Sequence, residues 1–150
     1  MDAEVITSSA NPRYRRLRSL IASSRDRHRE GRSVLEGIHL VESWLAQGAA
    51  QDAPEARGMA GAALELVVAQ RALGNPAVRA LVARAGGAPL VLQDRLFDSL
   101  GTMPSPAPLI AVVPTPAPVL PERLDTDTVI LDRVQDPGNV GAILRTAAAA

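Results

Sequence analysis

Hydrophobic positions along the first two thirds of the chain switch between helix-like and strand-like spacing. Apolar residues three and four positions apart predict a helix that begins at Asn11-Pro12, since asparagine caps helices and proline suits their first position. The same pattern predicts helices over residues 38–47, 76–85 and 95–100. Short apolar runs predict strands over residues 33–35, 63–69, 90–92 and 109–113. Strands that alternate with helices indicate an α/β sandwich around a parallel or mixed sheet.

A proline-rich stretch interrupts this pattern. Seven of the twelve prolines lie between Pro104 and Pro121, so residues 109–113 are expected to form an edge strand between two proline groups. Residues 114–127 are predicted to be a stiff, extended linker, with a proline-rich ligand for a partner domain as the alternative.

Beyond the linker the pattern predicts a strand followed by a helix. Residues 128–132 form an apolar run typical of a buried strand, and residues 140–150 have helical spacing. One strand and one helix cannot bury both faces of the strand. We therefore expect residues 128–150 to begin a second domain, most of which is missing from the chain.

Composition narrows the class of protein. The chain has 150 residues, 47% of them hydrophobic, and no net charge, which excludes disordered and collagen-like proteins. It has no cysteine and only two histidines, so neither a disulfide framework nor a structural metal is expected. No apolar window is long enough for a membrane span, and the first residues do not resemble a signal peptide. These features predict a cytoplasmic protein without a membrane anchor.

Charge is distributed unevenly. All sixteen basic residues are arginines; residues 1–32 hold eight of them against four acidic residues, and residues 33–150 hold eight against twelve. Four arginines, Arg13, Arg15, Arg16 and Arg18, flank or oppose the apolar stripe of the first helix without interrupting it. Guanidinium groups clustered on a helix suit RNA phosphates, but the residues alone leave an ordinary solvated face equally open.

The turn before the last helix is the other candidate site. Asp136-Pro137-Gly138-Asn139 would connect a strand to a helix, with Gly138 in an unusual backbone conformation and Asn139 as the helix cap. Such a turn presents backbone N–H groups to an anion, although an ordinary connection explains the same residues. Arg145 lies six residues after Asn139, so the two do not share a helix face. Its spacing fits either a solvated arginine or one presented to a second subunit or to a phosphate.

The segment that runs from Leu131 to Ala147, LDRVQDPGNVGAILRTA, resembles the first motif of the SpoU (TrmH) family of RNA 2′-O-ribose methyltransferases, in the SPOUT superfamily. The N-terminal part is similar to the family's substrate-binding domain at Ile6-Thr7-Ser8, at Asn11-Pro12 with the arginine helix, and at Val34-Leu35-Glu36-Gly37. The resemblance covers essentially the whole chain, with the two parts in the family's order.

The resemblance implies roles for the matching residues. Arg145 would assist removal of the ribose 2′-hydroxyl proton by orienting and electrostatic help, since arginine is too basic to act as a free base. Asn139 would support the site, and the first helix would bind RNA through Arg13, Arg15, Arg16 and Arg18. The family uses S-adenosyl-L-methionine and forms its site across a homodimer.

The resemblance also implies what the chain lacks. The family's second and third motifs, which build most of the cofactor pocket and the trefoil knot, have no counterpart in the sequence. They are expected to lie beyond Ala150, so the cofactor-binding residues are unknown. The 150-residue chain is therefore expected to be inactive alone.

These inferences combine into one expected organisation. Residues 1–113 form an α/β/α sandwich that binds ribosomal or transfer RNA, residues 114–127 form the linker, and residues 128–150 begin the methyltransferase domain. Two alternatives stay open: a non-catalytic RNA-binding module, and an enzyme of another fold that uses residues 136–139 as a phosphate-binding turn. Three aromatic residues, Tyr14, Trp44 and Phe97, are too few to support base stacking, so recognition of RNA shape and backbone is expected.

Overall fold

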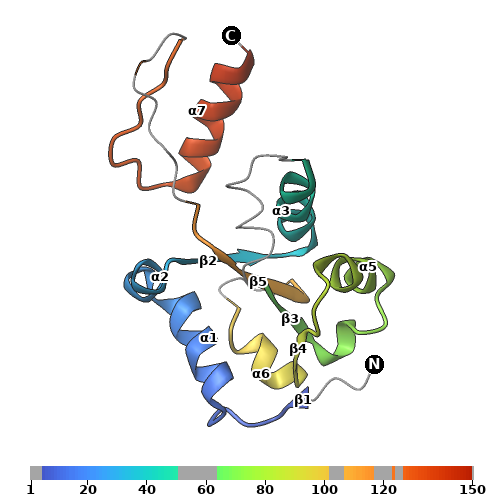
Figure 1. Ribbon diagram of the computed structural model, residues 1–150. Coiled ribbons are helices and arrows are strands. Elements are labelled where there is room, and N and C mark those ends of the chain that lie inside the picture. Colours follow the sequence, from blue (N-terminus) through green and yellow to red (C-terminus); the bar gives the residue numbers. More distant parts are fainter. Residues whose placement is uncertain (1–4, 51–63, 102–106, 117–122, 124–126, 150) are drawn as a thin grey trace. The chain divides into compact units, whose positions relative to one another are not determined.

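The computed structural model describes residues 5–50, 64–101, 107–116, 123 and 127–149 (Figure 1). The chain divides into two compact units, residues 1–116 and residues 117–150. Most of the predicted linker lies outside the described residues. No helix in the described ranges is both long enough and apolar enough to cross a membrane.

A five-stranded mixed sheet forms the first unit. Its strands are β1 (Val5–Ile6), β2 (Arg32–Glu36), β3 (Glu65–Ala69), β4 (Leu90–Leu92) and β5 (Leu109–Pro114), in the order β1-β4-β3-β5-β2. The β1–β4 and β3–β4 pairs are parallel, and the β3–β5 and β2–β5 pairs are antiparallel. The predicted α/β class and mixed sheet are therefore confirmed.

The prediction that residues 109–113 form an edge strand is wrong. β5 lies between β3 and β2 and pairs with both along its length, while β2 lies at the edge. Proline is excluded from a central strand because it lacks an N–H group to donate. Here Pro108 precedes the strand and Pro114 is its last residue, so residues 109–113 keep every backbone donor.

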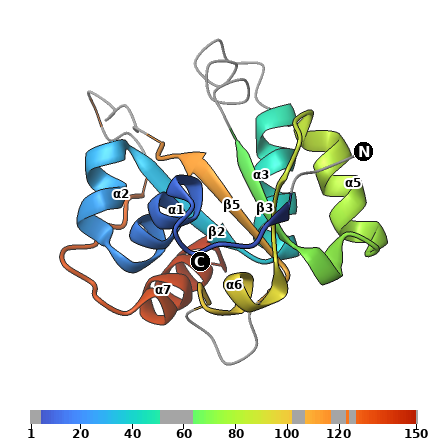
Figure 2. The ribbon, with the colours of Figure 1, turned by 90° about the horizontal axis from the view of Figure 1, so that it is seen from below.

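Helices cover both faces of the sheet. α3 (Ile38–Ala50) and α5 (Pro76–Ala85) lie on one side, and α1 (Pro12–Ala22) and α6 (Asp94–Asp98) lie on the other (Figure 2). A short 3-10 helix, η1 (Gln70–Ala72), follows β3. The core between these layers is apolar, and the described residues include no buried polar or charged side chain.

Capping explains why several elements begin and end where they do. Asn11 accepts a hydrogen bond from the backbone N–H of Arg13 at the start of α1, and Asn75 does the same for Ala77 at the start of α5. Gly86 ends α5 in the left-handed conformation that glycine adopts without strain. Gly37, with φ of +101°, makes the turn from β2 into α3.

One helix was not predicted from the sequence. α2 (Ser24–Glu30) occupies the polar stretch after α1 and contains no buried residue. Because its sequence has no apolar face, hydrophobic periodicity could not indicate it. It begins at Ser23, whose hydroxyl accepts from the N–H of Asp26, and it ends at Gly31 in the left-handed conformation.

The described residues of the second unit form an extended segment and one helix, α7 (Pro137–Ala149). The prediction of a buried strand over residues 128–132 is wrong: no strand forms there, and Ile130 is 81% exposed. A β-strand requires a neighbour for its backbone hydrogen bonds, and no described segment pairs with these residues.

Helix α7 begins three residues earlier than predicted, at Pro137. Its predicted last residue, Ala150, lies outside the described residues, so helix α7 is described only as far as Ala149.

Candidate nucleic-acid interface

Helix α1 is anchored through its apolar stripe. Tyr14, Leu17 and Leu20 are buried, which confirms the face predicted from their spacing. The Tyr14 hydroxyl lies 2.7 Å from Oγ of Ser99, and Ser99 donates its own proton to the carbonyl of Leu96. The Tyr14 hydroxyl therefore donates to Ser99, which fixes the helix against the segment after α6.

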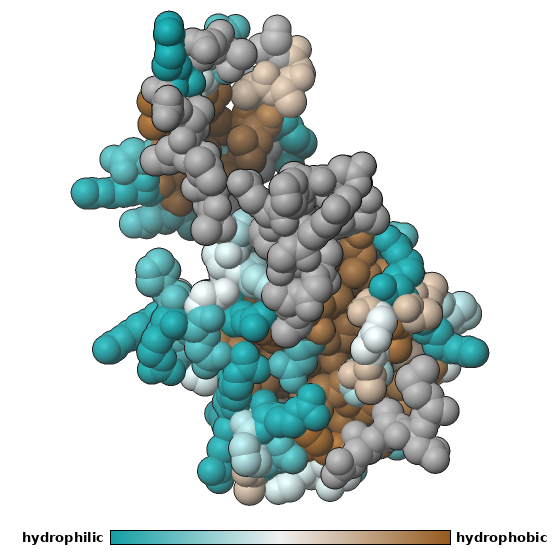
Figure 3. Space-filling view, viewed as in Figure 1, coloured by the Kyte–Doolittle hydropathy of each residue, from teal (hydrophilic) through white to brown (hydrophobic). Residues whose placement is uncertain are grey.

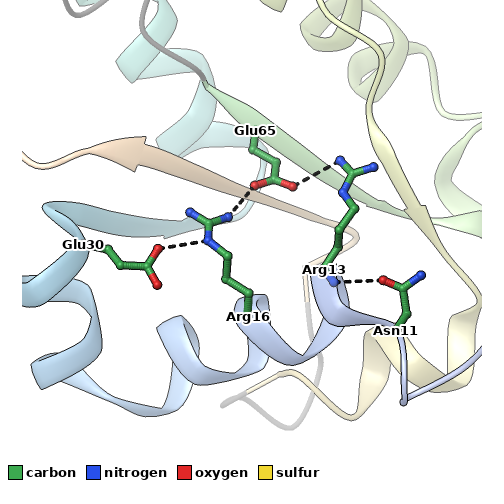
Figure 4. Close-up of polar contacts among 5 residues, drawn as sticks. All are labelled: Asn11, Arg13, Arg16, Glu30 and Glu65. Carbon is green, nitrogen blue, oxygen red and sulfur yellow. Dashed lines mark hydrogen bonds and ion pairs between the residues drawn. The ribbon is translucent and has the colours of Figure 1, made fainter.

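Two of the four predicted RNA-binding arginines are engaged within the fold. Arg13 Nη2 lies 3.3 Å from Oε1 of Glu65, and Arg16 Nη1 lies 3.0 Å from Oε2 of the same carboxylate (Figure 4). Arg16 Nε also pairs with Oε2 of Glu30 at 2.9 Å. Partial burial opposes the charge on Arg16, but the bonds and charges of Glu30 and Glu65 outweigh it and raise the pKa of Arg16. Both guanidinium groups thus connect α1 to the start of β3.

The other two arginines lie on a different face. Arg15 and Arg18 are three residues apart and exposed, and neither has a side-chain partner among the described residues. At about 100° per residue, Arg15 lies almost opposite the buried stripe, while Arg13 and Arg16 lie beside it. Figure 3 shows hydrophilic side chains gathered over α1 and α2. Of the four arginines predicted to bind RNA, two are therefore held in ion pairs within the fold, and the other two are exposed without a side-chain partner among the described residues.

Three side chains that sequence reasoning missed, Ser19, Asp26 and Arg27, hold α2 against α1. The Ser19 hydroxyl donates to Oδ2 of Asp26, and Arg27 Nη1 donates to the carbonyls of Leu20 at 2.8 Å and Ile21 at 3.0 Å. The bond from Ser19, together with the positive charges of Arg29 and Arg25, lowers the pKa of Asp26. The only sequence signal was Ser23 with Asp26 three residues later, a helix-start pattern with aspartate in place of glutamate.

All three aromatic side chains of the chain pack in or against the hydrophobic core. Tyr14 and Phe97 are buried, and Trp44 is half-buried against the same hydrophobic cluster. None is thus presented to a nucleic-acid base. The chemistry that the surface of α1 offers to RNA is that of guanidinium groups, which bind phosphate.

The turn before α7 differs from its prediction. Oδ1 of Asp136 accepts hydrogen bonds from the N–H groups of Gly138 at 2.6 Å and Asn139 at 3.1 Å, so Asp136 caps the helix. Asn139 is not the cap; it is the third helical residue, and its side chain is exposed. Gly138 does not adopt a positive φ. A Cβ atom there would lie 2.9 Å from Oδ1 of Asp136, so a side chain at this position would displace the carboxylate that caps the helix.

Arg145 lies back along α7 over Gly141. A Cβ atom on Gly141 would lie 3.2 Å from Nη1 of Arg145, as expected for side chains that point toward the helix N-terminus. Arg145 is exposed and has no ion-pair partner within the described ranges. Arg145 and Asn139 are not brought together, since six helical positions place them about 120° apart around the helix and about 9 Å apart along it.

The described residues do not form a complete cofactor or metal site. No three potential metal ligands come together among them. In residues 127–149 every side chain that the structure describes is exposed or half-exposed, so these residues do not enclose a nucleoside-sized molecule. They do not fit S-adenosyl-L-methionine on their own. That the cofactor-binding motifs lie beyond Ala150 stays a prediction, because the described residues end at Ala149 and do not test it.

Comparison with known proteins gives relatives of one kind. No family model matches the sequence. The chain is 33% identical, over 99% of its length, to an uncharacterised tRNA/rRNA methyltransferase of Synechocystis, of which it covers 50%. A crystal structure of an RNA 2′-O ribose methyltransferase matches 97% of the chain with a TM-score of 0.67 and 29% identity, and the chain covers 52% of it.

A second solved structure carries the family description. The SpoU methyltransferase AviRb from Streptomyces viridochromogenes, in complex with AdoMet, matches 93% of the chain with a TM-score of 0.68 and 25% identity. The chain covers 49% of that protein, and it spans about half the length of each of the relatives described here. In sequence and in α/β fold the chain is therefore similar, over nearly its whole length, to RNA methyltransferases that include a SpoU methyltransferase.

Proposed function

We propose that the chain is the RNA-binding half of an S-adenosyl-L-methionine-dependent RNA 2′-O-ribose methyltransferase. The observation that carries this proposal is the match to a tRNA/rRNA methyltransferase over 99% of the chain. The RNA would be ribosomal or transfer RNA, and the complete enzyme would act as a homodimer. Residues 1–113 would form the RNA-binding domain, residues 114–127 the linker and residues 128–150 the start of the methyltransferase domain. We also expect the complete enzyme to be located in the cytoplasm.

RNA binding would use the exposed face of α1. Arg15 and Arg18 are free to contact phosphates directly, whereas Arg13 and Arg16 are held by Glu65 and Glu30. Contacts of this kind follow the RNA backbone and are weakened by salt, because each releases bound counterions.

The first experiment compares RNA binding by two matched double variants. Fluorescence anisotropy with a short RNA hairpin measures affinity across a series of salt concentrations. Replacing Arg15 and Arg18 with glutamine should lower the slope of log affinity against log salt by about 0.7–0.9 for each lost phosphate contact. Replacing Arg13 and Arg16 removes the same charge, yet it should chiefly lower stability. If the 150-residue chain binds no RNA, the proposed function is wrong.

In the complete enzyme, Arg145 would orient the ribose 2′-hydroxyl and stabilise its developing negative charge, and Asn139 would support that site. The exposure of Arg145 and its lack of a partner among the described residues support this role, because a guanidinium that must contact RNA cannot be neutralised within its own helix. S-adenosyl-L-methionine would supply the methyl group.

Methyl transfer is tested with radiolabelled S-adenosyl-L-methionine and ribosomal RNA. The 150-residue chain alone is expected to be inactive, and the product of the complete gene is expected to be active. A 2′-O-methyl group makes the adjacent phosphodiester resistant to alkali, which identifies the modified position. A non-catalytic RNA-binding module is the second candidate; it would bind RNA but transfer no methyl group in either form.

A further inference from the structure

Helix α2 carries more basic side chains than its contacts with the rest of the fold require. Its seven residues include three arginines and one histidine, and none of the seven is buried. Arg27 has a structural task, because it donates to the last carbonyls of α1. The remaining basic residues, Arg25, His28 and Arg29, are exposed, and with Ser24 they line an open hollow on one face of the helix.

The negative charge beside this hollow is already engaged. Asp26 accepts a hydrogen bond from Ser19 and pairs with Arg29, whose Nη2 lies 3.1 Å from its Oδ1. Arg25 forms no ion pair among the described residues. A single ion pair leaves most of the five N–H donors of Arg29 available to another acceptor. The hollow therefore keeps a net positive charge and several unused donors.

The hollow is connected to the exposed face of α1. Ser19 lies four residues after Arg15, so the two share a face, and Ser19 contacts α2 through Asp26. Arg29 reaches the same Asp26 from the other side. Arg15 and the basic residues of α2 thus flank one bridge between the helices, the Ser19–Asp26 contact.

The side chains of this surface favour a polyanion as the ligand. Protein interfaces depend on buried apolar and aromatic anchors. α2 offers none, and the apolar residues Tyr14, Leu17 and Leu20 of α1 point into the core. Arginine and histidine side chains around an open hollow suit phosphate oxygens, for which the guanidinium fork provides paired donors.

We propose that Arg25, His28 and Arg29 of α2 form a second phosphate-binding site, which extends the RNA-binding face of α1 along the RNA backbone. This inference rests on the proposed RNA-binding function. It adds three residues to the four arginines of α1 that the sequence predicted to bind RNA, and it predicts that RNA contacts both helices, α1 and α2.

The test measures RNA binding by the 150-residue chain with the same hairpin probe. The Arg25→Gln/Arg29→Gln variant should bind about fivefold to tenfold more weakly for each lost contact near 0.1 M salt, and its salt slope should fall by up to about 1.8. A matched control, Arg79→Gln/Arg84→Gln, removes two exposed arginines from α5 on the other side of the sheet and should leave the slope unchanged.

The outcomes separate this site from the proposed function. If the α2 variant binds like the unmodified chain while Arg15→Gln/Arg18→Gln binds weakly, the α2 site is wrong and RNA binding by α1 stands. If the α5 control loses as much affinity, overall charge explains the effect and the site is again wrong. If the unmodified chain binds no RNA, both proposals fail.

Two further variants serve as controls for an effect of the substitutions on folding. Arg25→Gln breaks no ion pair among the described residues, so it decides the question if the double variant is unfolded by circular dichroism. Arg25→Lys/Arg29→Lys keeps both charges but loses the guanidinium fork. It should restore the salt slope while recovering only part of the affinity, a pattern that a purely structural role for these residues would not produce.

Discussion

Replacing Glu65 with glutamine would test how α1 divides its arginines between the fold and RNA. The Glu65 carboxylate pairs with Arg13 at 3.3 Å and with Arg16 at 3.0 Å, and the side chains concerned are 27–61% exposed. Ion pairs at such exposure contribute about 0.2–1 kcal/mol each. The Glu65→Gln variant should therefore lose roughly 0.5–1.5 kcal/mol of unfolding free energy, measured by urea titration at neutral pH.

The same substitution should strengthen RNA binding. It removes the negative charge that attracts Arg13, whereas Arg16 keeps its ion pair with Glu30 at 2.9 Å. One additional phosphate contact would steepen the salt slope by about 0.7–0.9 and raise affinity about fivefold to tenfold near 0.1 M salt. Glu42→Gln is the matched control, because it removes an exposed carboxylate from α3.

Two results would refute this reasoning. An unchanged unfolding free energy would mean that the two ion pairs contribute nothing to the fold. An unchanged salt slope, or an equal gain for Glu42→Gln, would mean that Arg13 does not reach phosphate when released.

Three further predictions concern stability. Phe97→Ala should cost about 3–5 kcal/mol of unfolding free energy in a denaturant titration, since Phe97 is 0% exposed; a cost below about 1 kcal/mol would contradict its place in the core. Asp26→Asn should destabilise the chain at neutral pH. Because the folded-state pKa lies below the ordinary 3.8, the difference from the unmodified chain should disappear as pH falls through that lowered pKa, and a difference that persists in strong acid would disprove the assignment. Asp136→Ala should reduce helix content by circular dichroism, because it removes the acceptor for the N–H groups of Gly138 and Asn139; Asp132→Ala, outside the cap, should not.

Local sequence predicted those elements whose ends are defined by their own residues. The bounds of α5 were predicted correctly because Asn75 caps it, Pro76 starts it and Gly86 ends it. The position of β5 in the sheet could not be predicted in the same way. Its five apolar residues indicated a strand, but its central place depends on pairing with β2 and β3, which are distant in sequence.

Prediction from hydrophobic periodicity failed in opposite ways for two segments: it missed helix α2, and it predicted a strand over residues 128–132 that does not form. α2 has no apolar face, and it is stabilised by polar contacts such as the bond from Ser19 to Asp26. Residues 128–132 have the apolar run of a buried strand, yet Ile130 is 81% exposed because no described segment pairs with them. Hydrophobic pattern therefore reports what a segment could bury, whereas burial itself depends on a neighbouring element.

The candidate site illustrates the same dependence at the level of single residues. Arg13, Arg15, Arg16 and Arg18 lie on one helix, and the sequence alone predicts the same RNA-binding role for all four. Their roles diverge because Glu65, far along the chain at the start of β3, lies within reach of Arg13 and Arg16 only. The sheet thereby neutralises one flank of α1 and leaves the opposite face basic. An arginine-rich helix can in this way both stabilise its domain and bind phosphate, because different faces of the helix carry the two tasks.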